Sequence, residues 1–365
     1  MCHRIILFLL CCMFNVCAET DMEQLMATMT IEQKIGQLFM VASVSDISIN
    51  QMFMQRTPYQ VNPDYIKNMI TEYYVGGVIF LGDATQDTMH KTVHEFQQLA
   101  KIPLLIGLDA EWGVAMRVKD GRYFDKNDIL GQLSNEEVFE IAQEIGKDCK
   151  ELGVHINFAP VVDINTNPDN PIIGARSFGN DKDNVAQKGI AYMQGLQSVG
   201  VLSCAKHFPG HGDTNVDSHL QLPILNHNKN RLYAIEISPF IQMIKSNVPA
   251  IMMGHLSAPA LDETGTPASV SKKIIQKILR DELGFDGLVI TDGLGMRALT
   301  DHYESGVLEL NALLAGNDIL LCPVDLPKAI DCIKIAIKDG LVSIEQIDEH
   351  VRRILNAKNK VIIEK

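Results

Sequence analysis

Short apolar runs recur along the chain, and each is followed by a polar stretch with helical spacing. The runs are continuous in Val, Ile and Leu rather than alternating, which is typical of strands buried on both faces of a parallel sheet. Eight runs are therefore predicted as strands: residues 38–42, 75–81, 104–108, 155–162, 201–205, 250–253, 287–290 and 318–321.

Several of the intervening stretches carry clear helix signals. Residues 135–151 have apolar side chains at helical spacing and acidic residues in the first turn, and residues 271–283 and 344–356 are similar. Another helix is expected to begin after Thr30, an N-cap residue with Gln33 at the capping-box position. Eight strands alternating with helices predict an α/β fold, a (β/α)8 TIM barrel, with a doubly wound open sheet as the alternative.

The extent of the fold follows from length and linker composition. No linker rich in Pro, Gly or Ser, low-complexity tract or short repeat divides the 365 residues, and α/β barrels of this size form one unit. We therefore predict a single catalytic barrel over residues 22–365. The long loops at residues 45–62 and 165–184 are expected to build its mouth.

The N-terminal residues have the pattern of a secretory signal. Arg4 precedes an apolar run at residues 5–16 that is too short to span a bilayer, and small residues follow it. We predict that residues 1–18 are a signal peptide and that the protein is secreted or periplasmic, without stable membrane insertion after cleavage. A lipoprotein attached through Cys17 is the weaker alternative, because bulky Val16 stands where a small residue is expected.

Charge and cysteine content exclude some classes of function. The net charge is −13, and no basic stripe interleaved with aromatics occurs, so no nucleic-acid partner is expected. Four of the eight cysteines precede residue 18, and the sequence has no CxxC pair. A disulfide scaffold or a structural zinc site of that type is therefore not indicated, and Cys204 and Cys322 are expected to be buried small apolar residues.

Polar side chains gather where the predicted strands end, which in a barrel is the rim that holds the active site. They are Asp109 and Glu111 after the third strand, Asp163 and Arg176 after the fourth, Lys206, His207, His211, Asp213, Asp217 and His219 after the fifth, His255 after the sixth, and Asp292 after the seventh. We expect these groups to converge on one site.

Two positions on this rim suit particular catalytic roles. Asp292 directly follows a predicted strand and precedes a glycine, which suits a nucleophile, although a helix N-cap is an equal alternative. Asp217 can orient His219 as a general acid/base, or the pair can form an Asx-turn with an exposed imidazole. A metal site built from the same histidines and acids is not expected, because Lys206 is a poor neighbour for a cation.

These residues resemble the signature of a known family. Residues 206–214 (KHFPGHGDT), followed by Asp217-Ser-His219, closely resemble glycoside hydrolase family 3 in its β-N-acetylhexosaminidase branch. Residues 159–167 (APVVDINTN), 173–179 (IGARSFG) and 287–296 (GLVITDGLGM) agree with it. The resemblance covers nearly all of the chain after the signal.

The resemblance implies a TIM barrel and a retaining mechanism with double displacement. The implied nucleophile is Asp292, and the implied acid/base is His219 paired with Asp217. The implied sugar-hydroxyl ligands are Asp109, Arg176, Lys206 and His207.

Two departures from the family pattern are visible. The Asp-x-Glu-Gly-Gly-Arg stretch is kept only in part, as Asp109-Ala-Glu111-Trp112-Gly113 with Arg117 displaced, so the outer sugar pocket is expected to differ. Thr291 stands where the family often has a second Asp before the nucleophile.

We therefore expect an exo-acting β-N-acetylglucosaminidase that removes terminal β-linked N-acetylhexosamine, for example from peptidoglycan fragments, without a cofactor. A β-glucosidase or a β-N-acetylglucosaminide phosphorylase of the same family is the alternative, the latter because a neutral imidazole does not repel phosphate. A catalytically silent sugar-binding barrel is the non-enzyme alternative, and the occupied catalytic positions argue against it.

Overall fold

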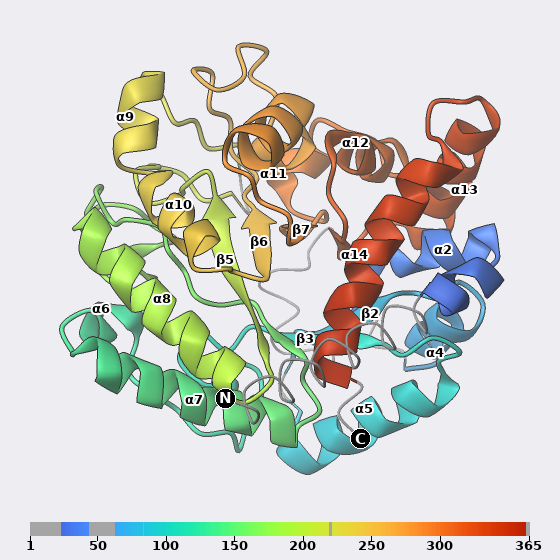
Figure 1. The fold of residues 1–365 in the computed structure, drawn as a ribbon, viewed down its shortest axis with the longest axis horizontal. Helices are drawn as coiled ribbons and strands as arrows, with labels where there is room; N and C mark the ends of the chain where they lie inside the picture. The colour runs from blue at the N-terminus through green and yellow to red at the C-terminus, as the bar shows by residue number, and fades with distance from the viewer. Residues whose placement is uncertain (1–22, 44–62, 83, 219–220, 363–365) are drawn as a thin grey trace, which may run out of the picture.

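The computed structural model describes residues 23–43, 63–82, 84–218 and 221–362, and these form a parallel barrel surrounded by helices (Figure 1). The strands are β1 (Phe39–Ser43), β2 (Gly77–Phe80), β3 (Leu105–Leu108), β4 (Ile156–Asn157), β5 (Leu202–Phe208), β6 (Ala250–Met253), β7 (Leu288–Thr291) and β8 (Leu320–Leu321). Their order is β7-β6-β5-β4-β3-β2-β1-β8, and every pairing is parallel.

Contacts between β7 and the start of β8 close the barrel. Ile290 forms a parallel bridge with Ile319. The N–H of Thr291 donates to the carbonyl of Ile319 at 3.0 Å, and the N–H of Asp318 donates to the carbonyl of Val289 at 2.7 Å. The predicted (β/α)8 fold is therefore confirmed, and the open doubly wound sheet is excluded.

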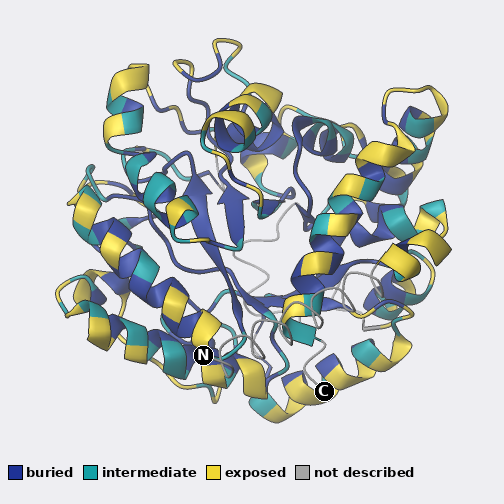
Figure 2. Ribbon diagram, in the orientation of Figure 1, coloured by how far each residue is buried: buried dark blue, intermediate teal, exposed yellow. Residues whose placement is uncertain are grey.

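Helices cover the outside of the barrel and bury their inward faces against it, while their outward faces are exposed (Figure 2). The α-helices are α2 (Ile31–Gln37), α4 (Pro63–Thr71), α5 (Gln86–Leu99), α6 (Asn127–Leu130), α7 (Asn135–Glu151), α8 (Lys182–Ser198), α9 (Lys229–Ala234), α10 (Ser238–Lys245), α11 (Arg297–Thr300), α12 (Val307–Ala315), α13 (Leu326–Lys338) and α14 (Ile344–Ile362). The remaining helical segments are η1 (Val114–Met116), η2 (Gly174–Arg176), η3 (Ala268–Val270) and η4 (Lys273–Glu282). Among the described helices, none combines the length and apolar composition needed to cross a bilayer.

Local signals set several helix boundaries where they were predicted. The hydroxyl of Thr30 accepts from the N–H of Gln33, and the side-chain oxygen of Gln33 accepts from the N–H of Thr30, which completes the predicted capping box. Helix α7 has the predicted bounds and begins with a second capping box, between Ser134 and Glu137.

Three helical segments differ from the prediction, one in its type and two in their bounds. Segment η4 is a π-helix rather than an α-helix, and α14 continues six residues beyond the predicted end at Asn356. Helix α8 begins at Lys182, so it takes the last residues of the predicted loop at 165–184. The other predicted mouth loop at 45–62 and the predicted signal at 1–18 lie outside the described residues.

The predicted strands all lie in the barrel, although their lengths differ. Strand β4 keeps only two residues of the apolar run at 155–162. Beyond it the chain still contacts β5, through the Val161–Lys206 bridge and through the N–H of Cys204, which donates to the carbonyl of Ala159 at 2.8 Å. Strand β5 extends to Phe208 and so contains Lys206 and His207. Cys204 and Cys322 are buried, as predicted.

Candidate active site

The site begins at the end of β3, where buried contacts fix the backbone that carries Asp109 and Glu111. The side chain of Asn157 on β4 accepts from the N–H of Ala110 and donates to its carbonyl, both at 3.0 Å. The hydroxyl of Tyr192 on α8 donates to the carbonyls of Ala110 at 2.9 Å and Glu111 at 3.0 Å. The fully buried Tyr192 and Asn157 thus hold the acidic pair in a single orientation.

Glu111 lies at the centre of a buried ion-pair network. Arg176 binds its carboxylate with two nitrogens, Nε at 2.9 Å and a terminal nitrogen at 2.7 Å. The Nζ of Lys206 lies 2.7 Å from the same carboxylate. Burial alone would raise the pKa of Glu111, but Arg176 and Lys206 outweigh it and hold that pKa well below its usual range. Glu111 is therefore a fixed anion that orients two cations.

Asp109 extends this network toward the mouth. Its carboxylate accepts from Lys206 at 2.9 Å and from Arg117 at 3.1 Å. Burial opposes ionisation, but Lys206 and Arg117 lower the pKa of Asp109 below its usual range. Conversely, the pKa of Lys206 is raised by its two carboxylate neighbours against the effect of burial. The displaced Arg117 thus still reaches Asp109, despite the departure from the family spacing.

Asp163, after β4, fixes the imidazole of His207. Its carboxylate lies 2.7 Å from Nδ1 of His207 and also accepts the backbone N–H groups of His207 and His211. A carboxylate at Nδ1 favours the tautomer that carries the proton there, which leaves Nε2 as an acceptor. That Nε2 faces the guanidinium of Arg176 at 3.5 Å. His207 therefore joins the charge network in a defined tautomer.

Asp292 stands directly after β7, as predicted. Its backbone N–H donates to the carbonyl of Met253 on β6 at 3.0 Å, and its carboxylate accepts the N–H of Gly293 at 2.8 Å. The buried His255 donates to or accepts from Ser269 and contacts the carbonyl of Gly293 at 2.9 Å. The strand end and its glycine neighbour are therefore held rigidly, while the carboxylate is partly exposed.

The loop after β5 reaches across to the segment that follows Asp292. The carbonyl of Ser218 accepts from the N–H of Ala298 at 3.3 Å, and the Ser218 hydroxyl lies 3.2 Å from Nε2 of His211. Burial lowers the pKa of His211 to about 4, so its imidazole is neutral near pH 7. Asp217 precedes Ser218 directly, and it thus lies beside the segment that follows Asp292. The predicted pairing with His219 lies outside the described residues.

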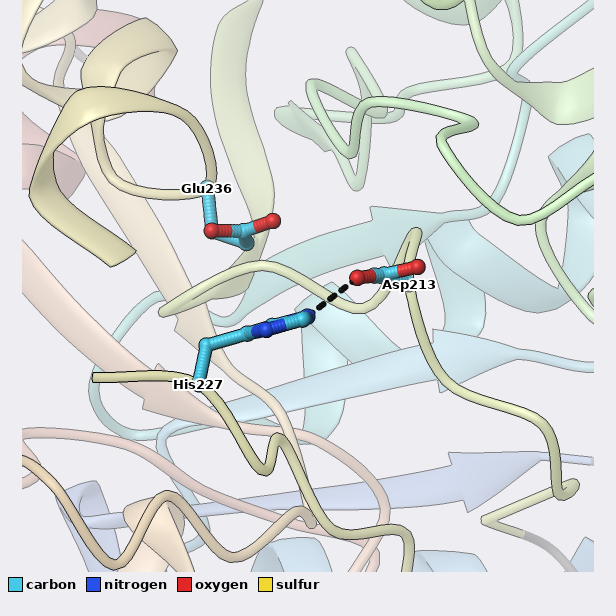
Figure 3. A group of neighbouring side chains, drawn as sticks. All are labelled: Asp213, His227 and Glu236. Atoms are coloured by element: carbon cyan, nitrogen blue, oxygen red, sulfur yellow. Dashed lines mark hydrogen bonds and ion pairs between the residues drawn. The ribbon is translucent and has the colours of Figure 1, made fainter. Parts of the chain in front are cut away.

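A second side-chain cluster borders the same loop (Figure 3). Asp213, His227 and Glu236 bring one potential ligand atom each within 4.8 Å of one another, the group of this kind found among the described residues. His227 hydrogen-bonds Asp213 through Nε2, and Arg231 binds Glu236 at 2.5 Å. A cation, the guanidinium of Arg231, therefore already lies against both carboxylates of this group.

The structure brings Asp109, Arg176, Lys206 and His207 together, as the sequence indicated. The central roles of Glu111 and Asp163 were not predicted, although both were noted at strand ends. A buried strand-end acid next to a predicted sugar ligand is the signal that could have found them. Their partners, however, lie 65 and 44 residues away in sequence.

A parallel (β/α)8 barrel with a buried network of carboxylates and cations at the carboxyl ends of its strands defines the class of this protein. The sequence profile of the glycosyl hydrolase family 3 N-terminal domain matches residues 30–357. The chain belongs to glycosyl hydrolase family 3.

Individual relatives support this membership. Beta-hexosaminidase A of Pseudoalteromonas piscicida is 32% identical over 332 residues, which are 82% of this chain and 56% of that protein. Beta-hexosaminidase LpqI of Mycobacterium tuberculosis is 32% identical over 80% of this chain and 77% of its own length. A solved family 3 β-N-acetylglucosaminidase from Paenibacillus sp. superposes with a TM-score of 0.84 at 36% identity, over 93% of this chain and 64% of that one. The chain thus spans less than two thirds of two of these three proteins.

Proposed function

We propose that this protein is a retaining, exo-acting β-N-acetylglucosaminidase. The observation that carries the proposal is the hydrogen bond between the carbonyl of Ser218 and the N–H of Ala298. It joins the loop that contains Asp217 to the segment that follows Asp292, so that a candidate acid/base and a candidate nucleophile share one rim. A double displacement needs these two groups on the same side of the barrel.

In the proposed reaction Asp292 attacks the anomeric carbon and forms a glycosyl-enzyme. Its carboxylate is oriented by the Gly293 N–H, which donates to it at 2.8 Å. His219, oriented by Asp217, protonates the leaving oxygen and then takes a proton from the water that hydrolyses the intermediate.

The terminal sugar is held by the buried network. Lys206, Arg176 and the Nε2 of His207 offer donors and an acceptor to sugar hydroxyls, while Asp109 accepts from them. These charges are mutually paired before the sugar arrives, so the hydroxyls meet groups that are already oriented. Such preorganisation lowers the entropic cost of binding.

The preference for N-acetylglucosamine is proposed from the named activities of the relatives, two β-hexosaminidases and a β-N-acetylglucosaminidase. Peptidoglycan fragments are the proposed natural source of such ends. This substrate agrees with the proposed signal at residues 1–18, which would place the enzyme outside the cytoplasm.

A panel of chromogenic glycosides tests the proposal. We expect release from the β-N-acetylglucosaminide, with a much lower kcat/KM for the β-glucoside. Comparing reactions with and without phosphate separates water from phosphate as the acceptor, and we expect free N-acetylglucosamine in both. Sugar binding without release from any member would instead indicate a silent binding barrel, and a sugar 1-phosphate product would indicate a phosphorylase.

A further inference from the structure

Asp213, His227 and Glu236 (Figure 3), together with Arg231 on α9, form a cluster that joins the loop after β5 to residues 227–236. His227 hydrogen-bonds a carboxylate oxygen of Asp213, and Arg231 lies 3.8 Å from the same oxygen. Arg231 also binds both oxygens of Glu236, at 2.5 and 2.6 Å. Only 3% of the Glu236 side chain is exposed, so this end of the cluster is firmly embedded.

Side-chain pairing that holds two chain segments together explains this arrangement better than a bound divalent metal ion does. The two carboxylates share one guanidinium, which lies 3.8 Å from Asp213 and 2.5 Å from Glu236. A metal ion at the same place would lie against the positive charge of Arg231, which repels it. The cluster therefore holds two chain segments together through its own side chains.

The same loop is also held by contacts other than the Asp213–His227 pair. The N–H of His211 donates to Asp163 at 2.7 Å, and the side chain of Asn167 donates to the carbonyl of Thr214 at 2.9 Å. The backbone is also tightly packed, because a Cβ added at Gly210 would approach Glu236 Cβ to 2.8 Å and one at Gly212 would overlap the carbonyl of Ile164. The backbone of residues 210–214 is thus held in place on several sides.

The proposed acid/base pair follows residues 210–214 closely in the sequence. Asp213 precedes Asp217 by four residues and His219 by six. A displacement of residues 210–214 would therefore be passed on to Asp217, and proton transfer is sensitive to small errors of distance. In contrast, Asp292 directly follows β7, and its backbone N–H donates to the carbonyl of Met253 on β6.

We propose that the Asp213–His227 pair positions the acid/base segment of the loop after β5. The two residues act as positioning residues, since proton transfer itself is assigned to Asp217 and His219. The inference rests on the proposed glycosidase function and adds to it His227, which lies outside the motifs quoted above.

The leaving group of the substrate provides the test. An activated aryl leaving group departs with little protonation, whereas a poor alkyl leaving group or a sugar needs the acid. For His227→Leu and for Asp213→Ala we expect kcat/KM to fall about 10- to 100-fold on the poor leaving group, a part of what acid catalysis contributes. On the activated one, we expect kcat/KM to change about twofold or less. Because both changes break one interaction, the double variant should lose no more than either single one.

Two further variants separate positioning from a general loss of structure. His227→Gln places an amide N–H where Nε2 lies and should restore most of the activity on the poor leaving group. Asp348→Asn is the matched control, because Asp348 pairs with Lys34 on α2 at a similar side-chain exposure, 25% against 20% for Asp213. Helices α2 and α14 lie across the barrel from α9 (Figure 1), and we expect Asp348→Asn to leave both substrates unaffected.

Equal losses on activated and poor leaving groups, or a failure of His227→Gln to restore activity, would overturn the positioning role. A change of the wild-type leaving-group dependence on adding Zn²⁺ or a chelator would overturn it in favour of a metal site. If the wild type releases no sugar from any glycoside, the proposed function itself fails. The two failures are therefore distinguishable.

Discussion

At the scale of single residues, the charges at the mouth of the barrel are arranged to stay fixed over the working pH range. Burial acts against each of them, yet Glu111 is held ionised by Arg176 and Lys206, which are held charged in return. A buried ion pair of this kind contributes little net stability but is costly to break. Its value here is orientation of the groups that meet the sugar.

The change Glu111→Gln tests this view, because it removes the charge while keeping the shape. Arg176 would lose its bidentate partner inside the protein, and we expect the free energy of unfolding to fall by about 3–5 kcal/mol. We also expect weaker binding of the sugar, since both cations lose their orientation. Urea denaturation and the KM for a chromogenic substrate measure the two effects.

The control for this change is Glu144→Gln. Glu144 also pairs with an Arg and a Lys, but its side chain is 39% exposed on α7. Solvent screens such pairs, so we expect little or no change in the free energy of unfolding. Similar effects of the two substitutions would contradict the importance of the buried network.

His219→Ala tests the proposed acid/base at the same scale. Without the imidazole we expect a poor leaving group to be slowed by about 100-fold or more, since general acid catalysis typically contributes that much. Glycosyl transfer from an activated aryl glycoside should be affected far less. Steady-state kcat/KM across aryl glycosides of graded leaving-group pKa measures the difference, and parallel losses throughout the series would argue against His219 as the acid.

The sequence predicted the position of residues that directly follow an apolar run, as Asp292 follows β7. It did not predict the partners of those residues. The ring of His207 depends on Asp163, and the two are brought together only when β4 and β5 lie side by side. Such contacts between distant residues have no local pattern in one sequence.

At the scale of elements, local chemistry explains what could be predicted. The capping boxes at Thr30 and Ser134 are made by residues three apart, so they can be read directly from the chain. The π-helical η4 was missed because its apolar face has the spacing of an ordinary helix. The length of β4 was also missed, since a continuous apolar run does not show where pairing stops.

Helix α14 carries a buried lysine that makes the stability of the protein depend on pH. The Nζ of Lys358 donates to the side-chain oxygen of Gln37 at 2.6 Å, and burial lowers the pKa of Lys358 to about 7. Below pH 7 the folded protein must bury a charge that the unfolded chain exposes to water. This cost is relieved as the pH rises from about 7 toward the ordinary value of 10.5.

We predict that Lys358→Met removes this dependence. The variant should be more stable relative to the wild type at pH 7 than at pH 9.5. The difference should shrink by up to about 1.4 kcal/mol per pH unit between these values. Chemical denaturation at a series of pH values measures it, with Lys360→Met, an exposed position on the same helix, as the control. A difference that is constant with pH would show that Lys358 is charged in the folded protein throughout.

At the scale of the whole molecule, the fold follows from the count and character of the apolar runs. Eight runs without alternation require eight strands that are covered on both faces, and a closed barrel with outer helices satisfies this with no exposed edge. The bridge between Ile290 and Ile319 makes the closure. The barrel then places all strand ends, and hence the whole candidate site, on one rim.

The most direct test of the central claim is to trap the glycosyl-enzyme. A 5-fluoro-β-N-acetylglucosaminyl fluoride carries a good leaving group and slows the hydrolysis of the intermediate. Intact-protein mass spectrometry should then show one added fluorinated N-acetylglucosaminyl group, and peptide mapping should locate it on Asp292. The Asp292→Asn variant should fold normally, as judged by circular dichroism, and should show no adduct. An adduct on another residue, or turnover of glycosides with inversion at the anomeric carbon, would contradict the assignment of Asp292 as the nucleophile.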